Sequence, residues 1–191
     1  IREPAVAGTF YSKDPTVLRR EIRFLLSNAK CKLNTIPKAI IVPHAGYKFS
    51  GPVAAEAYAH IEKFSHRFNR VVLLGPCHRV ATRGLATPSN SFFSTPLGKL
   101  PINRSDIEKI HRFPQVHEHD KTHKDEHSLE VQLPFLQEVL NDFSLIPLIV
   151  GDAQANEVAE VLDALWGSEE TLIVISSDLT HYLDYKTAKR I

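Results

Sequence analysis

Residues 39–44 read Ala39-Ile40-Ile41-Val42-Pro43-His44, an apolar run that stops at a proline and is followed at once by a histidine. A run without alternating polar residues is typical of a strand that is buried on both faces of a parallel sheet. Two further apolar runs end in a similar way, in Gly75-Pro76-Cys77-His78 and in Ser176-Ser177-Asp178. Because ligands of open α/β sheets bind at the carboxyl ends of the strands, the three ends predict a site at one edge of a sheet.

Strand and helix patterns alternate around these runs. Asp14 and Pro15 are a favourable N-cap and first residue for the first helix. The apolar stripe of that helix consists of Val17, Leu18, Ile22, Leu25 and Leu26. We then expect strands at 39–43, 70–74, 145–150 and 171–176. The stretch 84–102 is expected to be β-rich, with a hairpin turn at 97–100. Further helices are expected after a cap at Ser50 and at 104–112, 129–140 and 158–165. This alternation predicts one α/β domain over residues 1–191, with three α/β/α layers around a mostly parallel central sheet.

The composition excludes several classes of protein. The chain is 43% hydrophobic and 24% charged, which fits a packed core and not global disorder. Its net charge of +1 offers no bulk attraction for nucleic acid, and no apolar run approaches the roughly 20 residues of a membrane span. No apolar stretch follows Ile1-Arg2-Glu3-Pro4, and the two cysteines, Cys31 and Cys77, lie far apart. We therefore expect a cytoplasmic protein with reduced thiols and with neither nucleic-acid nor membrane partners.

His44 and His78 each follow one of the first two strands. Neutral imidazole is the commonest metal ligand in proteins, and two histidines on adjacent strands can share one ion. The alternative for each is a histidine that caps the strand end and hydrogen-bonds a loop carbonyl. Cys77 should point away from His78, because neighbours on an extended segment face opposite sides, so we interpret it as a packed residue.

Asp178 and His181 lie three residues apart after the last strand, and a turn there would place them on one face. Asp178 can bind a metal, fix the tautomer of a histidine, or cap a following helix. His127 precedes the helix expected along 129–140, whose positive end favours a neutral imidazole that can act as a base or a ligand. A solvent-exposed histidine near the helix start is the alternative.

The other six histidines are expected at the surface, three in a charged loop over 113–126 and three on helices: His117, His119, His123, His60, His66 and His111. A Ser-His-Asp hydrolase is disfavoured, because its candidate residues lie too close in sequence and the chain has no Gly-x-Ser-x-Gly elbow; these residues are Ser176, Ser177, Asp178 and His181. Glycine-rich phosphate-binding motifs are absent as well.

Five segments together resemble the Memo family, whose bacterial and archaeal members are often called AmmeMemoRadiSam system protein B. In chain order they are Arg2-Glu3-Pro4-Ala5-Val6-Ala7-Gly8-Thr9-Phe10-Tyr11, Pro43-His44-Ala45-Gly46-Tyr47, Gly75-Pro76-Cys77-His78-Arg79, Glu126-His127-Ser128-Leu129-Glu130 and Ser176-Ser177-Asp178-Leu179-Thr180-His181. Five motifs in the right order over nearly the whole chain make the resemblance specific. It implies a fold similar to that of the class III extradiol dioxygenases, which are non-haem iron enzymes that cleave catechol rings.

The resemblance also implies roles for individual residues. His44 and His78 correspond to the metal-binding histidines, and Fe(II) is the expected cofactor, with copper or zinc as alternatives. His127 and His181 correspond to pocket histidines with supporting or acid/base roles, and Asp178 lies beside them. The remaining ligand of the family is a Cys in Memo proteins and a Glu in the dioxygenases, and it follows the segment that matches here. We therefore expect that residues 1–191 lack a C-terminal segment that completes the site.

Three functions stay open. The first is a metal-dependent oxidoreductase, in which two histidines and one further ligand hold Fe(II) and leave positions for O2 and substrate, while His127 or His181 moves protons. The second is a non-enzymatic adaptor that recognises an anionic peptide or small ligand at the helix start near Ser50. The human family member is described as a signalling adaptor and as a redox-active metal protein. The third is a hydrolase that uses zinc-activated water. The family's name further implies a radical-SAM protein as a partner.

Overall fold

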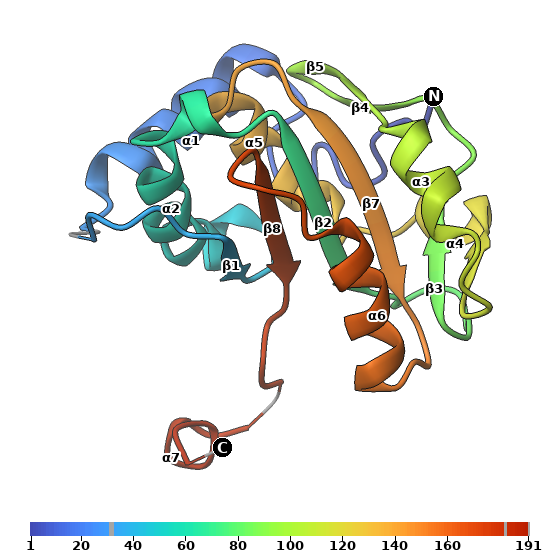
Figure 1. The fold of residues 1–191 in the computed structure, drawn as a ribbon. Helices are drawn as coiled ribbons and strands as arrows, with labels where there is room; N and C mark the ends of the chain where they lie inside the picture. The colour runs from blue at the N-terminus through green and yellow to red at the C-terminus, as the bar shows by residue number, and fades with distance from the viewer. Residues whose placement is uncertain (31–32, 182, 191) are drawn as a thin grey trace.

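The computed structural model describes residues 1–30, 33–181 and 183–190, so Cys31 lies outside the described residues. A six-stranded sheet forms the middle layer, and helices cover both of its faces (Figure 1). The predicted three-layer α/β/α architecture with a mostly parallel sheet is therefore confirmed. No helix in the described part of the chain is both long and apolar enough to cross a membrane.

The order of the strands across the sheet determines which loops meet at its carboxyl edge. In spatial order the strands are β1 (Ala39–Val42), β8 (Thr171–Ser176), β2 (Arg70–Pro76), β7 (Ser144–Val150), β3 (Leu85–Thr87) and β6 (Val116–Glu118). The first four run parallel to one another, β3 runs antiparallel to β7, and β6 runs parallel to β3. A separate antiparallel hairpin, within the stretch predicted to be β-rich, consists of β4 (Phe92–Thr95) and β5 (Gly98–Pro101).

The helices divide between the two faces of the sheet. One group packs together on one face: α1 (Pro15–Asn28), α2 (Tyr47–Glu62) and α5 (Leu133–Val139). On the other face α3 (Arg104–Ile110) packs against α6 (Ala155–Leu165). The short helical segments are α4 (Asp120–Lys124), α7 (Tyr185–Ala188) and the 3-10 turns η1 (Ser65–Arg67) and η2 (Glu130–Gln132).

Helix α1 begins where the sequence predicts. Oδ1 of Asp14 accepts hydrogen bonds from the backbone N–H groups of Thr16 and Val17, both at 2.9 Å, and satisfies donors that the first helical turn leaves free. Leu18 and Ile22 are fully buried, whereas Val17 is 41% exposed. The apolar stripe therefore begins one residue later than predicted.

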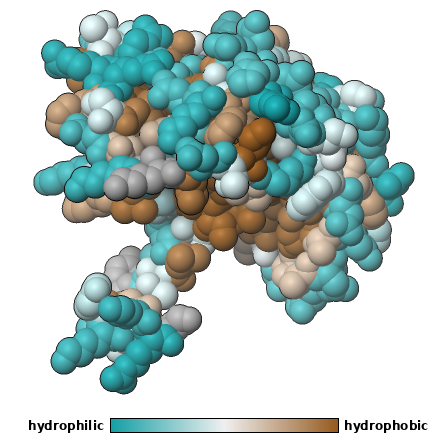
Figure 2. Space-filling view, turned by 60° about the vertical axis from the view of Figure 1, so that its left-hand side comes forward, coloured by the Kyte–Doolittle hydropathy of each residue, from teal (hydrophilic) through white to brown (hydrophobic). Residues whose placement is uncertain are grey.

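Strand β1 is not buried on both faces, so that prediction is wrong. It lies at one edge of the sheet, where its residues alternate between exposed and buried, and Ile41 is 60% exposed. Strand β2, in contrast, lies inside the sheet between two strands, and Leu73 is completely buried. After β8 the chain leaves the body and extends to α7 (Figure 1). Figure 2 shows an apolar surface on the side of the body from which this segment departs.

Two predictions of surface histidines are wrong. The stretch 113–126 contains β6 and α4, and His123 on α4 is only 2% exposed, with Nε2 3.0 Å from the carbonyl oxygen of Ala86. His60 on α2 is 4% exposed, and its Nε2 lies 2.6 Å from the carbonyl oxygen of Thr35. In both cases a backbone carbonyl accepts from the ring, which offsets much of the cost of burying a polar group.

Candidate metal centre

The predicted site residues come from three strand ends that are neighbours in the sheet. His44 follows β1, Asp178 follows β8, and His78 follows β2. The two histidines were predicted on adjacent strands, and this is wrong in detail, because β8 lies between β1 and β2. The loops still converge, and the ring centroids of His44 and His78 are 5.2 Å apart.

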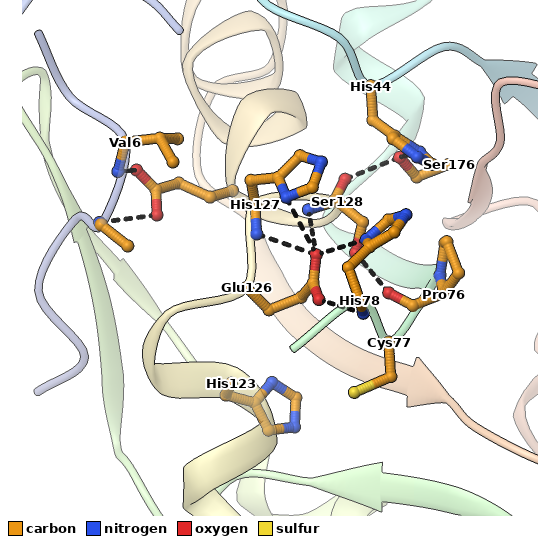
Figure 3. Close-up of polar contacts among 12 residues, drawn as sticks. Val6, His44, Pro76, Cys77, His78, His123, Glu126, His127, Ser128 and Ser176 are labelled. Carbon is orange, nitrogen blue, oxygen red and sulfur yellow. Dashed lines mark hydrogen bonds and ion pairs between the residues drawn. The ribbon is translucent and has the colours of Figure 1, made fainter. Parts of the chain in front are cut away.

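His127 reaches the same place from a different direction. It lies just before η2, and its ring centroid is 4.6 Å from that of His78 and 5.6 Å from that of His44 (Figure 3). One ligand atom from each of these three rings lies within 4.8 Å of the other two. A second set with the same spacing consists of His44, Asp178 and His181. Both sets are compact enough to surround a single ion, and they share His44.

A cleft of about 650 Å³ connects all five predicted residues: His44, His78, His127, Asp178 and His181. Its other walls are Thr9, Phe10, Ala45, Gly46 and Phe49. His44 lies at the buried end of the cleft, where its side chain is 2% exposed, and His181 lies at the open end, where its side chain is 52% exposed. The structure thus brings the residues together in one solvent-reachable hollow.

The environment of His44 selects one of its two neutral tautomers. Nδ1 lies 3.1 Å from Oγ of Ser176. The single hydroxyl proton of Ser176 is donated to the carbonyl oxygen of Ser128 at 2.6 Å, since a carbonyl can only accept. Nδ1 of His44 must then carry the proton and donate to Ser176, so Nε2 is left with a free lone pair.

Gln132 supports this assignment from deeper in the core. Its Oε1 accepts from the hydroxyl of Tyr58 at 3.0 Å, so its Nε2 faces Ser176 and donates to Oγ at 2.9 Å. The same amide nitrogen donates to the carbonyl oxygen of Pro43 at 2.9 Å. Ser176 therefore receives two hydrogen bonds and gives one, and the orientation of the His44 ring is set by buried groups.

Glu126 fixes the second imidazole. Its carboxylate accepts from Nδ1 of His78 at 2.9 Å and from the backbone N–H of His78 at 2.6 Å (Figure 3). The backbone N–H groups of His127 and Ser128 donate to the same carboxylate, each at 2.9 Å. Burial alone would raise the pKa of Glu126, but the hydrogen bonds from His78 and Ser128 hold this pKa below its usual value. Glu126 is therefore ionised, Nδ1 of His78 donates to it, and Nε2 of His78 is free to bind.

Asp178 ties the third strand end to the first. Its Oδ1 accepts from the backbone N–H of His44 at 2.6 Å, and its Oδ2 lies 3.6 Å from Nε2 of His44 and 3.4 Å from Nε2 of His181. Leu179, between the two predicted residues, has a φ of +60° and turns the chain so that Asp178 and His181 approach each other. Asp178 therefore does not cap a helix here; the N-cap of α7 is Asp184.

Burial also determines the charge of the pocket histidines. It lowers the pKa of His44 and of His127, and the neighbouring imidazoles lower both further, although Asp178 and Glu126 oppose the effect. Both rings are neutral near pH 7, which is the form that binds metal or accepts a proton.

The residues present fit a metal ion. Nε2 of His44 is buried and has no hydrogen-bond partner within the described part of the chain. A buried polar atom without a partner is costly, and a cation at this point would satisfy it. The donors around the cleft are imidazole nitrogens and a carboxylate oxygen, a set that suits iron, copper or zinc.

Sequence reasoning missed three residues of this centre, which are Glu126, Ser176 and Gln132. The first two lie inside the quoted motifs, and a polar residue at the end of a buried strand is the signal that could have marked Ser176. Cys77 was interpreted correctly: its Sγ donates to the carbonyl oxygen of Val80 at 2.8 Å, and the side chain points away from the imidazoles (Figure 3).

The start of α2 differs from the prediction. The helix begins at Tyr47 with Gly46 as its N-cap, and Oγ of Ser50 instead donates to the carbonyl oxygen of Ala45 at 2.6 Å. Ser50 therefore lies within the first turn and is not the cap. The helix predicted along 129–140 likewise starts as the 3-10 turn η2 and continues as α5.

Comparisons with known proteins identify the family to which the chain belongs. The family model described as Memo-like protein matches residues 2–191. A MEMO1 family protein of Aquifex aeolicus (strain VF5) is 40% identical over 100% of this chain and 71% of its own length. A MEMO1 family protein of Thermotoga neapolitana is 36% identical over 98% of this chain and 73% of its own length. A MEMO1 family protein of Methanopyrus kandleri is 35% identical over 99% of this chain and 72% of its own length. The chain belongs to the Memo family.

Proposed function

We propose that this protein binds a redox-active transition metal ion in the cleft through Nε2 of His44 and Nε2 of His78. The observation that carries the proposal is the pair of fixed tautomers, because Ser176 and Glu126 each occupy the Nδ1 side of one ring and leave both Nε2 atoms facing the cleft. Histidines whose Nδ1 is held in this manner by a hydrogen-bond partner are characteristic of metal ligands.

Iron is the metal that this proposal favours, with copper next and zinc third. Two imidazoles with one anionic group on the same face are the ligands typical of non-haem Fe(II), and the set of His44, Asp178 and His181 has this composition. A bound iron or copper ion would supply one-electron and O2 chemistry. The chain's own residues would transfer protons and bind the substrate. Neutral His127 would accept a proton beside the ligands, and the aromatic rings of Phe10 and Phe49 would flank an organic substrate in the cleft.

A second candidate function is recognition of an anionic ligand without turnover. The first turn of α2 borders the cleft at Gly46, which has no side chain to cap it, and helix N-termini attract anions. Partnership with a radical-SAM protein remains a prediction of the family resemblance.

The experiment that tests the metal proposal compares His44→Ala and His78→Ala with His66→Ala, which removes an exposed histidine on η1. Each protein is purified anaerobically, its bound iron, copper and zinc are measured, and its affinity for each ion is determined by equilibrium dialysis. We expect both cleft variants to lose stoichiometric metal and the control to keep it. Wild-type metal binding by both cleft variants would refute the proposal.

Oxygen uptake with catechols as probe substrates then separates the two functions. Metal-dependent turnover that both cleft variants lose supports the oxidoreductase. Affinity for an acidic peptide without any turnover supports the binding module.

A further inference from the structure

The segment Arg2–Tyr11 carries one of the five motifs, yet its role does not follow from the metal ligands alone. We call residues 2–11 the N-terminal strap. Its first anchor is a backbone pairing with β4: the N–H of Arg2 donates to the carbonyl of Phe92 at 2.9 Å, and the N–H of Ser94 donates to the carbonyl of Arg2 at 2.8 Å. The strap is thereby attached to the β4–β5 hairpin.

The guanidinium of Arg2 is the second anchor, and it is buried, since Arg2 is 5% exposed. Its Nε donates to the carbonyl of His123 at 2.9 Å and its Nη2 to the carbonyl of Glu126 at 2.7 Å. Its Nη1 forms an ion pair with the carboxylate of Glu130. One planar group therefore holds three points of the segment 123–130, which carries Glu126 and His127.

Glu130 binds the middle and the end of the strap. Its side chain is fully buried, and its carboxylate accepts from the backbone N–H groups of Ala5 and Val6 at 2.8 and 2.9 Å. The hydroxyl of Tyr11 donates to the same carboxylate at 2.7 Å. The charge of Glu130 is thus surrounded by donors from both ends of the strap.

The far end of the strap forms a wall of the cleft. The ring of Phe10 packs on the ring of His127 with 4.9 Å between centroids, and Thr9 and Phe10 both line the cleft. The carbonyl of Phe10 accepts from the N–H of Tyr47 at 2.8 Å, where α2 begins. The strap therefore joins the segment that carries Glu126 to the helix that follows His44.

We propose that Arg2 is a positioning residue of the metal centre. It fixes the backbone of Glu126, whose carboxylate orients His78, and through Glu130 it places Phe10 against His127. A purely stabilising role explains the arrangement less well, because a buried ion pair is seldom more stabilising than the apolar residues that could replace it. The inference rests on the proposed metal function, and it gives the motif at residues 2–11 a role at Glu126, which is 124 residues from Arg2 in sequence.

Arg2→Lys tests the proposal, because lysine keeps the charge near Glu130 but cannot donate to three acceptors in one plane. The matched control is Arg67→Lys, which alters an exposed Arg–Glu pair with Glu169. Two quantities are measured in the 191-residue protein: the dissociation constant for Cu(II), and the hydrogen-exchange rates of the backbone N–H groups of His78 and Ser128, which both donate to Glu126.

We expect Arg2→Lys to weaken Cu(II) binding about 10-fold, which is the lower end of the effect of removing a group that orients a ligand. The exchange of both amides should accelerate more than that of amides in β2, whereas Arg67→Lys should change neither quantity. A folded Arg2→Lys protein with wild-type Cu(II) affinity and wild-type exchange at both amides would overturn the proposal.

Two further variants keep the test decisive if Arg2→Lys does not fold. Tyr11→Phe removes one donor to Glu130 without changing the packing volume, and Arg2→Met with Glu130→Gln removes both charges together. Weaker Cu(II) binding in either folded protein supports the positioning role, and unchanged affinity in both contradicts it. If His44→Ala and His78→Ala both bind Cu(II) like the wild type, the proposed metal function fails instead, so the two failures are distinguishable.

Discussion

Glu126→Gln probes the group that orients His78, and it changes a single atom. The carboxylate of Glu126 accepts four hydrogen bonds, three of them at 2.9 Å to one oxygen and one at 2.6 Å to the other. In the variant the amide oxygen can keep the three shared donors, but the NH2 group then faces the backbone N–H of His78. The partly buried backbone N–H of His78 is left without an acceptor, and the remaining hydrogen bonds are no longer made to a charged group.

The expected loss of stability follows from these contacts. An unsatisfied buried donor costs about 1–3 kcal/mol, and hydrogen bonds to a charged acceptor are roughly twice as strong as neutral ones. We expect the free energy of unfolding to fall by about 2–4 kcal/mol. The His78 ring also loses its fixed orientation, and metal affinity should fall by about 10- to 100-fold.

Glu138→Gln is the matched control, because the Glu138 side chain is also buried and accepts from Arg19 and Arg23. It should reduce stability without changing metal affinity. Urea unfolding gives the free energy, and equilibrium dialysis with Cu(II) gives the affinity. A Glu126→Gln protein that binds Cu(II) as tightly as the Glu138→Gln protein would refute the role of Glu126 in holding His78.

Three further predictions concern other parts of the structure. Ser176→Ala should weaken metal binding about 10-fold by freeing Nδ1 of His44, while Ser177→Ala should not, and dialysis with Cu(II) measures both. Burial lowers the pKa of His123 to about 4 in the folded protein, from an ordinary value of 6.5. As the pH falls below 6.5, His123 becomes protonated in the unfolded chain but stays neutral in the folded protein until the pH approaches 4. Stability should therefore fall by about 2 kcal/mol between about pH 7.5 and about pH 5, and His123→Gln should remove that part of the pH dependence in urea unfolding. Leu73→Ala in the centre of β2 should cost about 2–5 kcal/mol in thermal or urea unfolding, whereas Val17→Ala on the exposed side of α1 should cost less than about 0.5 kcal/mol.

Local patterns predicted the elements of this fold well. The Asp14 cap and the apolar runs of β2, β7 and β8 depend on residues that are neighbours in sequence, and the structure confirms them. The burial of β1 was wrong because exposure depends on the position of a strand in the sheet. An apolar run cannot reveal that position.

In the candidate site, too, local sequence predicted some residues, whereas others depend on contacts between distant parts of the chain. The histidines and Asp178 could be identified from residue type and from their place at strand ends. Glu126 could not, because its role depends on a fold that brings it 48 residues back to His78. His123 was predicted at the surface because it lies in a charged stretch, and His60 because it lies on a helix, yet each is buried against a carbonyl that is distant along the chain.

The most direct test of the central claim is the tautomeric state of His44 and His78, read from nitrogen chemical shifts of protein labelled with 15N in histidine. Near pH 7.5 and without metal, we predict that both rings carry their proton on Nδ1. Addition of Zn(II) should then shift the Nε2 resonances of both residues while their Nδ1 protons stay in place. A proton on Nε2 of either ring in the metal-free protein, or Nε2 resonances that Zn(II) leaves unchanged, would contradict the account.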